Sequence, residues 1–287
     1  MTERNAVSSI TDPDALFRLA AGVYTGVLFA SGAATIAVLE ATSPLVLAGA
    51  ALVAFVLGSG AGIALAGRDR TLPARLGRSL KRRLVSLLPA AAFGVVALAS
   101  RFEWLVRSLF VVAFAAACAL LLAGHALSRA AQSRYVETLV IDEPAAAWRW
   151  SPRGTAWIDG LLLVLSLVFV FGNAIEGNWP SAIFWTVFAL LWSGGRVAEG
   201  RWRVDALGTT PRLRVHDAGL VKQRPFTRSL VPWESVSHVR LREDELVLDR
   251  GLFDVRFDSA ELDDPEGLRS AIDRYVSNAN SPPRTAG

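Results

Sequence analysis

The chain has 287 residues, 52% of them hydrophobic, and a formal net charge of +4. This composition is too apolar for an ordinary soluble protein and indicates a membrane protein. The single cysteine, Cys118, excludes a disulfide within the chain and a multi-cysteine metal site. The scarcity of lysine and the abundance of alanine are typical of a prokaryotic gene rich in GC.

Six apolar runs predict six transmembrane helices. They cover residues 19–39, 41–67, 84–100, 104–127, 157–174 and 181–195. The longer runs reach the roughly 20 residues that a bilayer requires, and the shorter ones approach that length. Short turns join the runs in pairs, so we expect three hairpins. Residues 1–16 are polar and lack the pattern of a secretory signal, so we expect the first run to remain as a helix.

The first two runs each contain a GxxxG motif, with Gly22 and Gly26 in one run and Gly58 and Gly62 in the other. Small residues at this spacing let two helices approach closely, so the first hairpin is predicted to pack tightly. The string GSGAG at 58–62 does not predict a nucleotide-binding loop, because no strand precedes it and no Lys-Ser/Thr follows it.

A basic loop sets the orientation of the helices. It runs from Arg68 to Arg83, reads RDRTLPARLGRSLKRR and contains one acid, Asp69. Dense Lys/Arg between apolar runs is typical of a cytoplasmic loop, and such a cluster also attracts anionic lipid headgroups. The candidate lipid contacts are Arg75, Arg78, Lys81, Arg82 and Arg83. A nucleic-acid partner is not expected, because no aromatic residues are interleaved with the basic ones.

The other charges and the tryptophans agree with this orientation. Residues 1–199 hold 16 Lys/Arg and 12 Asp/Glu, whereas residues 200–287 hold 14 of each. Six spans with both termini in the cytoplasm place 14 of the 16 inside and leave Arg101 and Arg107 outside. Six tryptophans are predicted to anchor the helices at the membrane interfaces: Trp104 and Trp179 outside, and Trp148, Trp150, Trp157 and Trp202 inside.

Few ionisable residues lie within the apolar runs. Glu103 and Arg107 are four residues apart at the start of the fourth run, so they share a helix face and can pair. His125 and Asp159 lie near inner edges, where water or an arginine is expected to solvate them. Transporters usually carry ionisable groups at mid-membrane or broken helices, and this sequence has little sign of either.

The pattern changes to short strands after Arg196. Alternation predicts strands over 212–216, 220–224, 229–233, 236–241, and around 246–248 and 253–257. These form an antiparallel meander with one buried face, and Trp233 is the expected centre of its core. A closing helix is predicted from Pro265 to Val276, with Asp264 as its N-cap and an apolar face turned toward the strands.

The phrase LVPWESV at 230–236, set between short strands and followed by a terminal amphipathic helix, resembles the prokaryotic PH-like domains. Pro232, Trp233 and Val236 carry the resemblance, which covers roughly residues 200–277. Family members often follow a membrane hairpin directly, as this region follows the fifth and sixth runs. The resemblance implies a curled sheet capped by a helix, and binding or assembly more than catalysis. Specific inositol-lipid binding is not expected, because the tip of the first hairpin, His216–Gly219, is not basic.

The sequence thus predicts a polar cytoplasmic N-terminus at 1–16, a transmembrane domain at 17–199, a cytosolic PH-like domain at 200–277 and a disordered tail at 278–287. The fold class is an α-helical bundle of six spans with a small β-rich domain. No HExxH, GxSxG, carboxylate pair or phosphate loop is present, so we expect neither an enzyme nor a cofactor. The predicted function is display of an interaction domain at the plasma membrane, with lipids and a protein partner or a second copy as ligands. A small transporter or channel with a regulatory domain is the alternative.

Overall fold

The structure is a computed structural model that describes residues 13–69, 71–106, 108–151, 156–198, 200–202, 210–251 and 254–279. The predictions for the N-terminal segment 1–12, for Arg107 and for the tail 280–287 lie outside these residues. The chain divides into two compact units. The helical unit holds the described residues up to Tyr135 and those from 156 to Gly195, and the sheet unit holds the described residues of 136–154 and those from Arg196 on.

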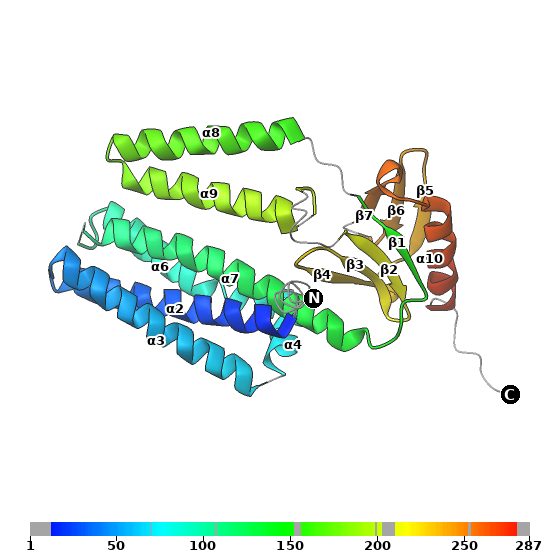
Figure 1. The fold of residues 1–287 in the computed structure, drawn as a ribbon, viewed down its shortest axis with the longest axis horizontal. Helices are drawn as coiled ribbons and strands as arrows, with labels where there is room; N and C mark the ends of the chain where they lie inside the picture. Colours follow the sequence, from blue (N-terminus) through cyan, green and yellow to red (C-terminus); the bar gives the residue numbers. More distant parts are fainter. Residues whose placement is uncertain are drawn as a thin grey trace, which may run out of the picture. The chain divides into compact units, whose positions relative to one another are not determined.

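The helical unit consists of eight helices among the described residues (Figure 1). They are α2 (Pro13–Leu39), α3 (Pro44–Arg68), α4 (Leu72–Gly77), α5 (Leu80–Val85), α6 (Leu88–Arg101), α7 (Leu109–Leu139), α8 (Ala156–Ile175) and α9 (Trp179–Ala198). Within the described ranges, four segments are long and apolar enough to cross a membrane: Ala15–Leu39, Pro44–Arg68, Leu109–Leu139 and Trp157–Ile175.

The other two predicted spans fall short for separate reasons. The 14 residues of α6 extend about 21 Å, which is less than the ~30 Å hydrocarbon core of a bilayer. The 20 residues of α9 are diluted by Trp, Ser and Gly, which lower its hydropathy. The predicted fourth span also begins later than expected, because α7 starts at Leu109 while Trp104 lies in a turn. The φ of Glu103 in that turn is 61°.

The α2–α3 hairpin is held by the two GxxxG motifs. A Cβ added at Gly58 would stand 2.8 Å from the Thr25 carbonyl oxygen, and one added at Gly62 would stand 2.7 Å from the Ala21 carbonyl oxygen. The Thr25 hydroxyl reaches the Gly58 carbonyl oxygen at 2.8 Å. The glycines are therefore required for the close approach of the two helices.

The basic loop folds into the two short helices α4 and α5. The Ser79 hydroxyl caps α5 by accepting the Arg82 backbone N–H at 3.3 Å. Gly77 packs on α7 so closely that an added Cβ would overlap the Ala131 carbonyl oxygen. Leu72 and Leu76 join a small core with residues of α2, α3 and α7. Apolar residues therefore hold the loop against the helices.

The sheet unit contains two antiparallel sheets and a closing helix (Figure 1). The first sheet has the order β1-β2-β3-β4, and the second has the order β5-β6-β7. Their strands are β1 (Ala146–Arg149), β2 (Arg212–His216), β3 (Gly219–Gln223), β4 (Arg228–Pro232), β5 (His238–Leu241), β6 (Glu245–Asp249) and β7 (Val255–Asp258). Two 3-10 turns, η2 (Trp233–Ser235) and η3 (Ser259–Glu261), precede α10 (Pro265–Ala279).

Alternating side chains build one core between the sheets and α10. Leu213, Val215, Leu220, Leu246 and Leu248 are fully buried. The closing helix packs against β5 and η2 and adds Leu268, Ile272 and Val276 to the core. Asp264 precedes this helix and accepts the Gly267 backbone N–H at 2.8 Å. The predicted antiparallel domain with a final helix is thus present.

Strand β1 corrects the prediction that Trp148 and Trp150 are membrane-interface anchors. Trp148 pairs with Leu213 in the first sheet and packs against the core. Trp150 is 6% exposed, meets the Phe257 ring edge-on at 5.5 Å and donates its indole N–H to Glu261 at 3.1 Å. Period-two alternation places both rings on the core face. Two tryptophans on either side of an arginine occur both in interface anchors and in sheet strands. The sequence pattern therefore did not distinguish an anchor from a strand.

Candidate functional site

A cavity of about 210 Å³ lies within the sheet unit, beside the outer face of the first sheet. The last turn of α7 and the segment leading to β1 contribute Val136, Glu137, Val140, Asp142, Glu143 and Pro144. Strands β2, β3 and β4 contribute Arg214, His216, Val221, Gln223 and Arg228. Because Leu213 and Val215 of β2 point into the core, their neighbours Arg214 and His216 are turned to this outer face.

The strand register places three arginines near the side-chain amide of Gln223. Gln223 of β3 pairs with Arg212 of β2 on one side and with Arg228 of β4 on the other. Arg214 lies two residues beyond Arg212, on the same face of β2. Cross-strand neighbours on one face are within reach of each other's side chains, so these four residues form one polar patch, of which Arg214, Gln223 and Arg228 line the cavity.

An ion pair and a histidine–carboxylate contact join the α7–β1 segment to the first sheet. Arg228 Nη1 lies 2.6 Å from Glu137 Oε1, and His216 Nδ1 lies 3.3 Å from Asp142 Oδ2. The Asp217 backbone N–H also donates to Asp142 at 3.1 Å. This backbone hydrogen bond lowers the pKa of Asp142, and the nearby His216 lowers it further. The segment is therefore fixed to the sheet at two points along the cavity.

Arg214 is the guanidinium group of the cavity that has no ion-pair partner among the described residues. Glu143, which also lacks one in those residues, is exposed. Burial lowers the pKa of Arg214, and the charges of Arg228 and Arg212 lower it further. Its Nε is buried without a hydrogen-bond partner in the described part of the chain, and so is the Oε1 atom of Gln223. The Nδ1 atom of His216 is a third such atom in the cavity lining. Buried polar groups that lack partners are costly, so Arg214 and Gln223 offer a donor and an acceptor to an occupant.

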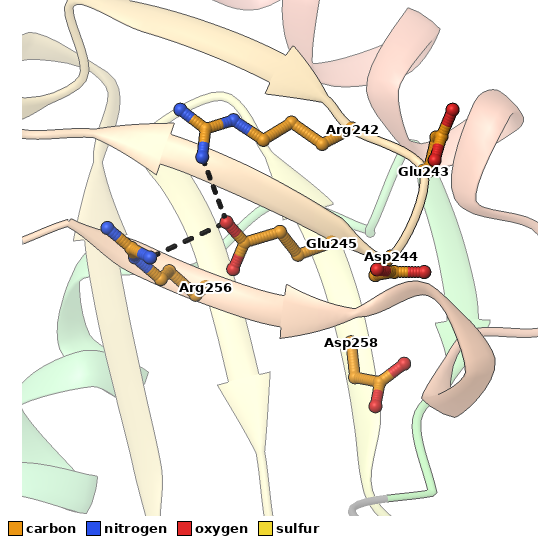
Figure 2. A pocket seen from close by; sticks show the side chains of 6 residues that line it. All are labelled: Arg242, Glu243, Asp244, Glu245, Arg256 and Asp258. Carbon is orange, nitrogen blue, oxygen red and sulfur yellow. Dashed lines mark hydrogen bonds and ion pairs between the residues drawn. The ribbon is translucent and has the colours of Figure 1, made fainter.

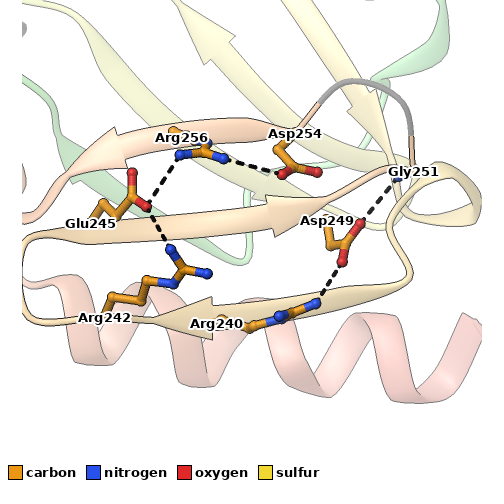
Figure 3. A network of polar contacts seen from close by, with 7 residues as sticks. All are labelled: Arg240, Arg242, Glu245, Asp249, Gly251, Asp254 and Arg256. Carbon is orange, nitrogen blue, oxygen red and sulfur yellow. Dashed lines mark hydrogen bonds and ion pairs between the residues drawn. The ribbon is translucent and has the colours of Figure 1, made fainter.

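The outer face of the second sheet carries a different arrangement, a lattice of alternating charges. Figure 2 shows Glu245 between Arg242 and Arg256, each of whose Nη1 atoms lies 3.5 Å from Glu245 Oε1. Figure 3 extends the lattice to Asp254, at 3.5 Å from Arg256. A separate pair joins Arg240 to Asp249 at 2.8 Å, and Asp249 also accepts the Gly251 backbone N–H.

This charged lattice has the properties of a solvated surface. Its arginine side chains are 55–61% exposed, and exposed ion pairs each contribute at most about 1 kcal/mol. The open hollow beside it is lined by Arg242, Glu243, Asp244, Glu245, Arg256 and Asp258 (Figure 2). Within the described ranges, no group of three or more His, Cys, Asp or Glu side chains is placed to hold a metal ion.

Lys222 is the most perturbed basic group on the inner side of the first sheet. Burial lowers its pKa to about 7, and the neighbouring charges of Arg224 and Arg250 contribute. Its Nζ lies 4.6 Å from the centroid of the Phe257 ring, and the Arg224 guanidinium lies 5.2 Å from the Trp150 ring. Both cations therefore sit on aromatic faces at the edge of the core.

Comparison with protein families agrees with this fold. Residues 210–277 match the family model described as the bacterial PH domain. The C-terminal region is a bacterial PH domain. The match begins just before β2 and ends within α10, so β1 and the α7–β1 segment lie outside it. Searches of curated proteins and of solved structures gave no match.

The structure places the LVPWESV residues inside the bacterial PH domain. Trp233 is 4% exposed, stacks on Tyr275 at 5.7 Å and donates its indole N–H to the His216 carbonyl oxygen at 2.9 Å. Val236 is 1% exposed, and Pro232 is half-buried at the end of β4. Trp233 and Val236 therefore belong to the core and are not available as a contact surface.

The candidate lipid and interface residues of the helical unit lie mostly on its surface. Arg75, Arg78, Lys81 and Arg82 are exposed, whereas Arg83 is half-buried. Trp104, Trp157 and Trp179 are 80%, 69% and 58% exposed. Trp202 is half-buried and belongs to the sheet unit. Asp159 is 2% exposed, so water does not solvate it, and it takes part in an interaction with another residue.

Sequence reasoning missed the cavity because one of its walls comes from residues that precede the apolar hairpin α8–α9. Arg212, Arg214 and Lys222 were visible as basic residues around the first strand hairpin, but nothing in the sequence brings Glu137 or Asp142 beside them. The alternation in the AAWRW stretch at 146–150 was the available signal for a strand. No local pattern indicates that this strand pairs with residues more than 60 positions later.

Proposed function

We propose that this chain is a multi-pass plasma-membrane protein that displays its bacterial PH domain in the cytoplasm as a binding or assembly module. The observation that carries the proposal is the insertion of the apolar hairpin α8–α9 between β1 and β2, two strands of one sheet. Both ends of the hairpin are therefore joined to the same soluble domain. The proposed role is non-enzymatic, which is supported by the absence of the usual catalytic motifs in the sequence.

The charge distribution supports the cytoplasmic side for the domain. The proposed topology has six spans, with α6 and α9 completing three hairpins, and puts both termini inside. It places 14 of the 16 basic residues of 1–199 in the cytoplasm. Short spans are accommodated by local thinning of the bilayer or by snorkelling of flanking residues, at a modest cost. Trp104, Trp157 and Trp179, which are exposed, are proposed to lie at the interfaces.

The proposed ligands are lipids and a protein. Exposed Arg75, Arg78, Lys81 and Arg82 on α4 and α5, together with Arg83, would contact anionic headgroups, since clustered basic residues at a membrane surface attract them. PH domains commonly mediate protein or lipid interactions, which fits a protein partner or a second copy of this chain on the domain.

Thiol labelling tests the topology. In a chain with Cys118 replaced, single cysteines are placed at the exposed positions Ser43, Asn178 and Ser151. An impermeant reagent applied to intact cells should label the cysteines at Ser43 and Asn178 and spare the one at Ser151. Labelling at Ser151 alone would invert the topology. Affinity purification from detergent then tests the role, with a stoichiometric protein partner as the expected result.

A small transporter or channel is the second candidate, and buried Asp159 in α8 is the observation that favours it. Ionisable residues buried in apolar helices often mark ion or substrate pathways. Proton flux in proteoliposomes, compared between the wild type and Asp159→Asn, tests this function. If Asp159→Asn abolishes the flux at normal expression, the transporter becomes the favoured function. A small solute that copurifies in place of a protein partner would support the same conclusion.

A further inference from the structure

Two guanidinium groups, Arg214 and Arg228, line the cavity together with three carboxylates of the α7–β1 segment. Glu137 pairs with Arg228, Asp142 lies against His216, and Glu143 is exposed, so Arg214 is the guanidinium left without a carboxylate partner among the described residues. Arg212, Arg214 and Arg228 lie on two strands around Gln223, and Glu137 is bonded to Arg228. No ion-pair partner of Arg212 or Arg214 is found within the described ranges. The charges of Arg228 and Arg212 repel that of Arg214 and contribute to lowering its pKa, so an anion placed beside Arg214 would relieve that repulsion.

The guanidinium of Arg214, which is unpaired among the described residues, is partly buried and lines the cavity. Arg214 Nε and Gln223 Oε1 have no hydrogen-bond partner in the described part of the chain, although both atoms are buried. Guanidinium groups stay protonated in proteins and offer donors in a fork that matches carboxylate and phosphate oxygens. Asp142 lies 3.3 Å from His216 and Glu137 pairs with Arg228, so neither of these carboxylates is paired with Arg214.

The size of the cavity limits its occupant. Its volume is about 210 Å³, roughly that of seven water molecules in the liquid. Pockets for drug-sized ligands usually measure about 300–1,000 Å³. The space therefore suits a small organic acid, a phosphate ester or a single headgroup, and excludes a peptide chain or a nucleotide.

We propose that this cavity binds a small ligand through one oxyanion, a carboxylate or a phosphate, with Arg214 as the principal contact. Gln223 completes the site, its amide N–H groups donating to the oxyanion and its free oxygen accepting from a ligand hydroxyl. The cavity lies wholly within the sheet unit, so this inference goes beyond the proposed membrane role and does not depend on the topology.

The test uses the full chain in an uncharged detergent at constant ionic strength. Inorganic phosphate, glycerol 3-phosphate and succinate are titrated separately, and the unfolding temperature is followed by tryptophan fluorescence, with chloride as the reference anion. Vesicles of phosphatidylglycerol and of phosphatidylcholine form a second arm that distinguishes a lipid headgroup from a free anion. At least one anionic probe is expected to stabilise the protein in a saturable way.

Variants then locate the site. Arg214→Gln should weaken the binding about tenfold or more, since hydrogen bonds to a charged group are the strong ones. Arg240→Gln, the same change on the exposed outer face of the second sheet, should leave the affinity unchanged. Gln223→Leu keeps every charge and should weaken the binding severalfold. If Arg214→Gln does not fold, the affinity of Gln223→Leu is the decisive test of the site. Equal stabilisation by chloride, or unchanged affinity in the decisive variant, would overturn the proposal.

Discussion

Replacement of Lys222 by methionine should stabilise the bacterial PH domain, and most strongly at neutral and acidic pH. The pKa of Lys222 is lowered from 10.5 to about 7, mainly by burial and then by Arg224 and Arg250. A shift of about 3.5 pKa units corresponds to about 5 kcal/mol, an upper bound on the cost of keeping this ammonium charged in the folded domain. Methionine has similar length and no charge to desolvate, so it removes that cost.

The sign of the pH dependence follows from proton linkage. Between pH 7 and 10.5 the unfolded chain holds a proton on Lys222 that the folded domain has released. The contribution of this group to the free energy of unfolding therefore rises with pH, by up to about 1.4 kcal/mol per pH unit. Below pH 7 Lys222 stays charged in the folded domain, so the full cost of burying its ammonium group is present. The advantage of Lys222→Met should accordingly shrink by about 2 kcal/mol between pH 7 and pH 9.

Urea unfolding of a single-chain fragment provides the assay. Residues 136–151 are joined to 210–279 by a flexible glycine-serine linker, and tryptophan fluorescence is followed at pH 6, 7.5 and 9. Arg240→Met, on the exposed outer face, serves as the control and should change neither the stability nor its pH dependence. Parallel pH profiles of the wild type and Lys222→Met would refute a buried, depressed lysine.

Three further predictions concern packing. A fragment of residues 208–277 alone should fail to fold stably, because it lacks β1 and Trp150, and a peptide of residues 142–151 should restore its circular dichroism spectrum. In the single-chain fragment, Trp233→Ala should lower the free energy of unfolding by about 3–5 kcal/mol, because the ring is buried in the core. Arg256→Ala should lower it by less than about 1 kcal/mol, because its ion pair is exposed. Urea titration measures both changes, and comparable losses would contradict the core position of Trp233. Gly58→Ile should separate α2 from α3 and lower the thermal stability of the full chain in detergent, whereas Gly49→Ile, at a position with open space, should not.

The sequence predicted those features that rest on local patterns. Strands β2 to β7 and α10 follow from alternation, turn residues and the cap at Asp264, and the family resemblance was confirmed for residues 210–277. The close α2–α3 pair follows from GxxxG spacing. Strand β1 and the cavity depend on a pairing across the whole α8–α9 hairpin, and such long-range contacts leave no periodicity in the sequence. The burial of Asp159 was missed for the same reason, since it depends on packing in three dimensions.

The split sheet has a consequence for how the protein is made. About 62 residues separate the end of β1 at Arg149 from the start of β2 at Arg212, which is roughly 3–12 s of synthesis. During that interval β1 exposes an unpaired edge and two tryptophans, a combination prone to wrong pairing. In the proposed topology, the two strands meet only if the intervening helices cross the bilayer an even number of times. Completion of the sheet would then act as a parity check on membrane insertion, because a chain in which one of α8 and α9 failed to insert would leave β1 and β2 on opposite sides of the bilayer, unpaired and open to proteolysis.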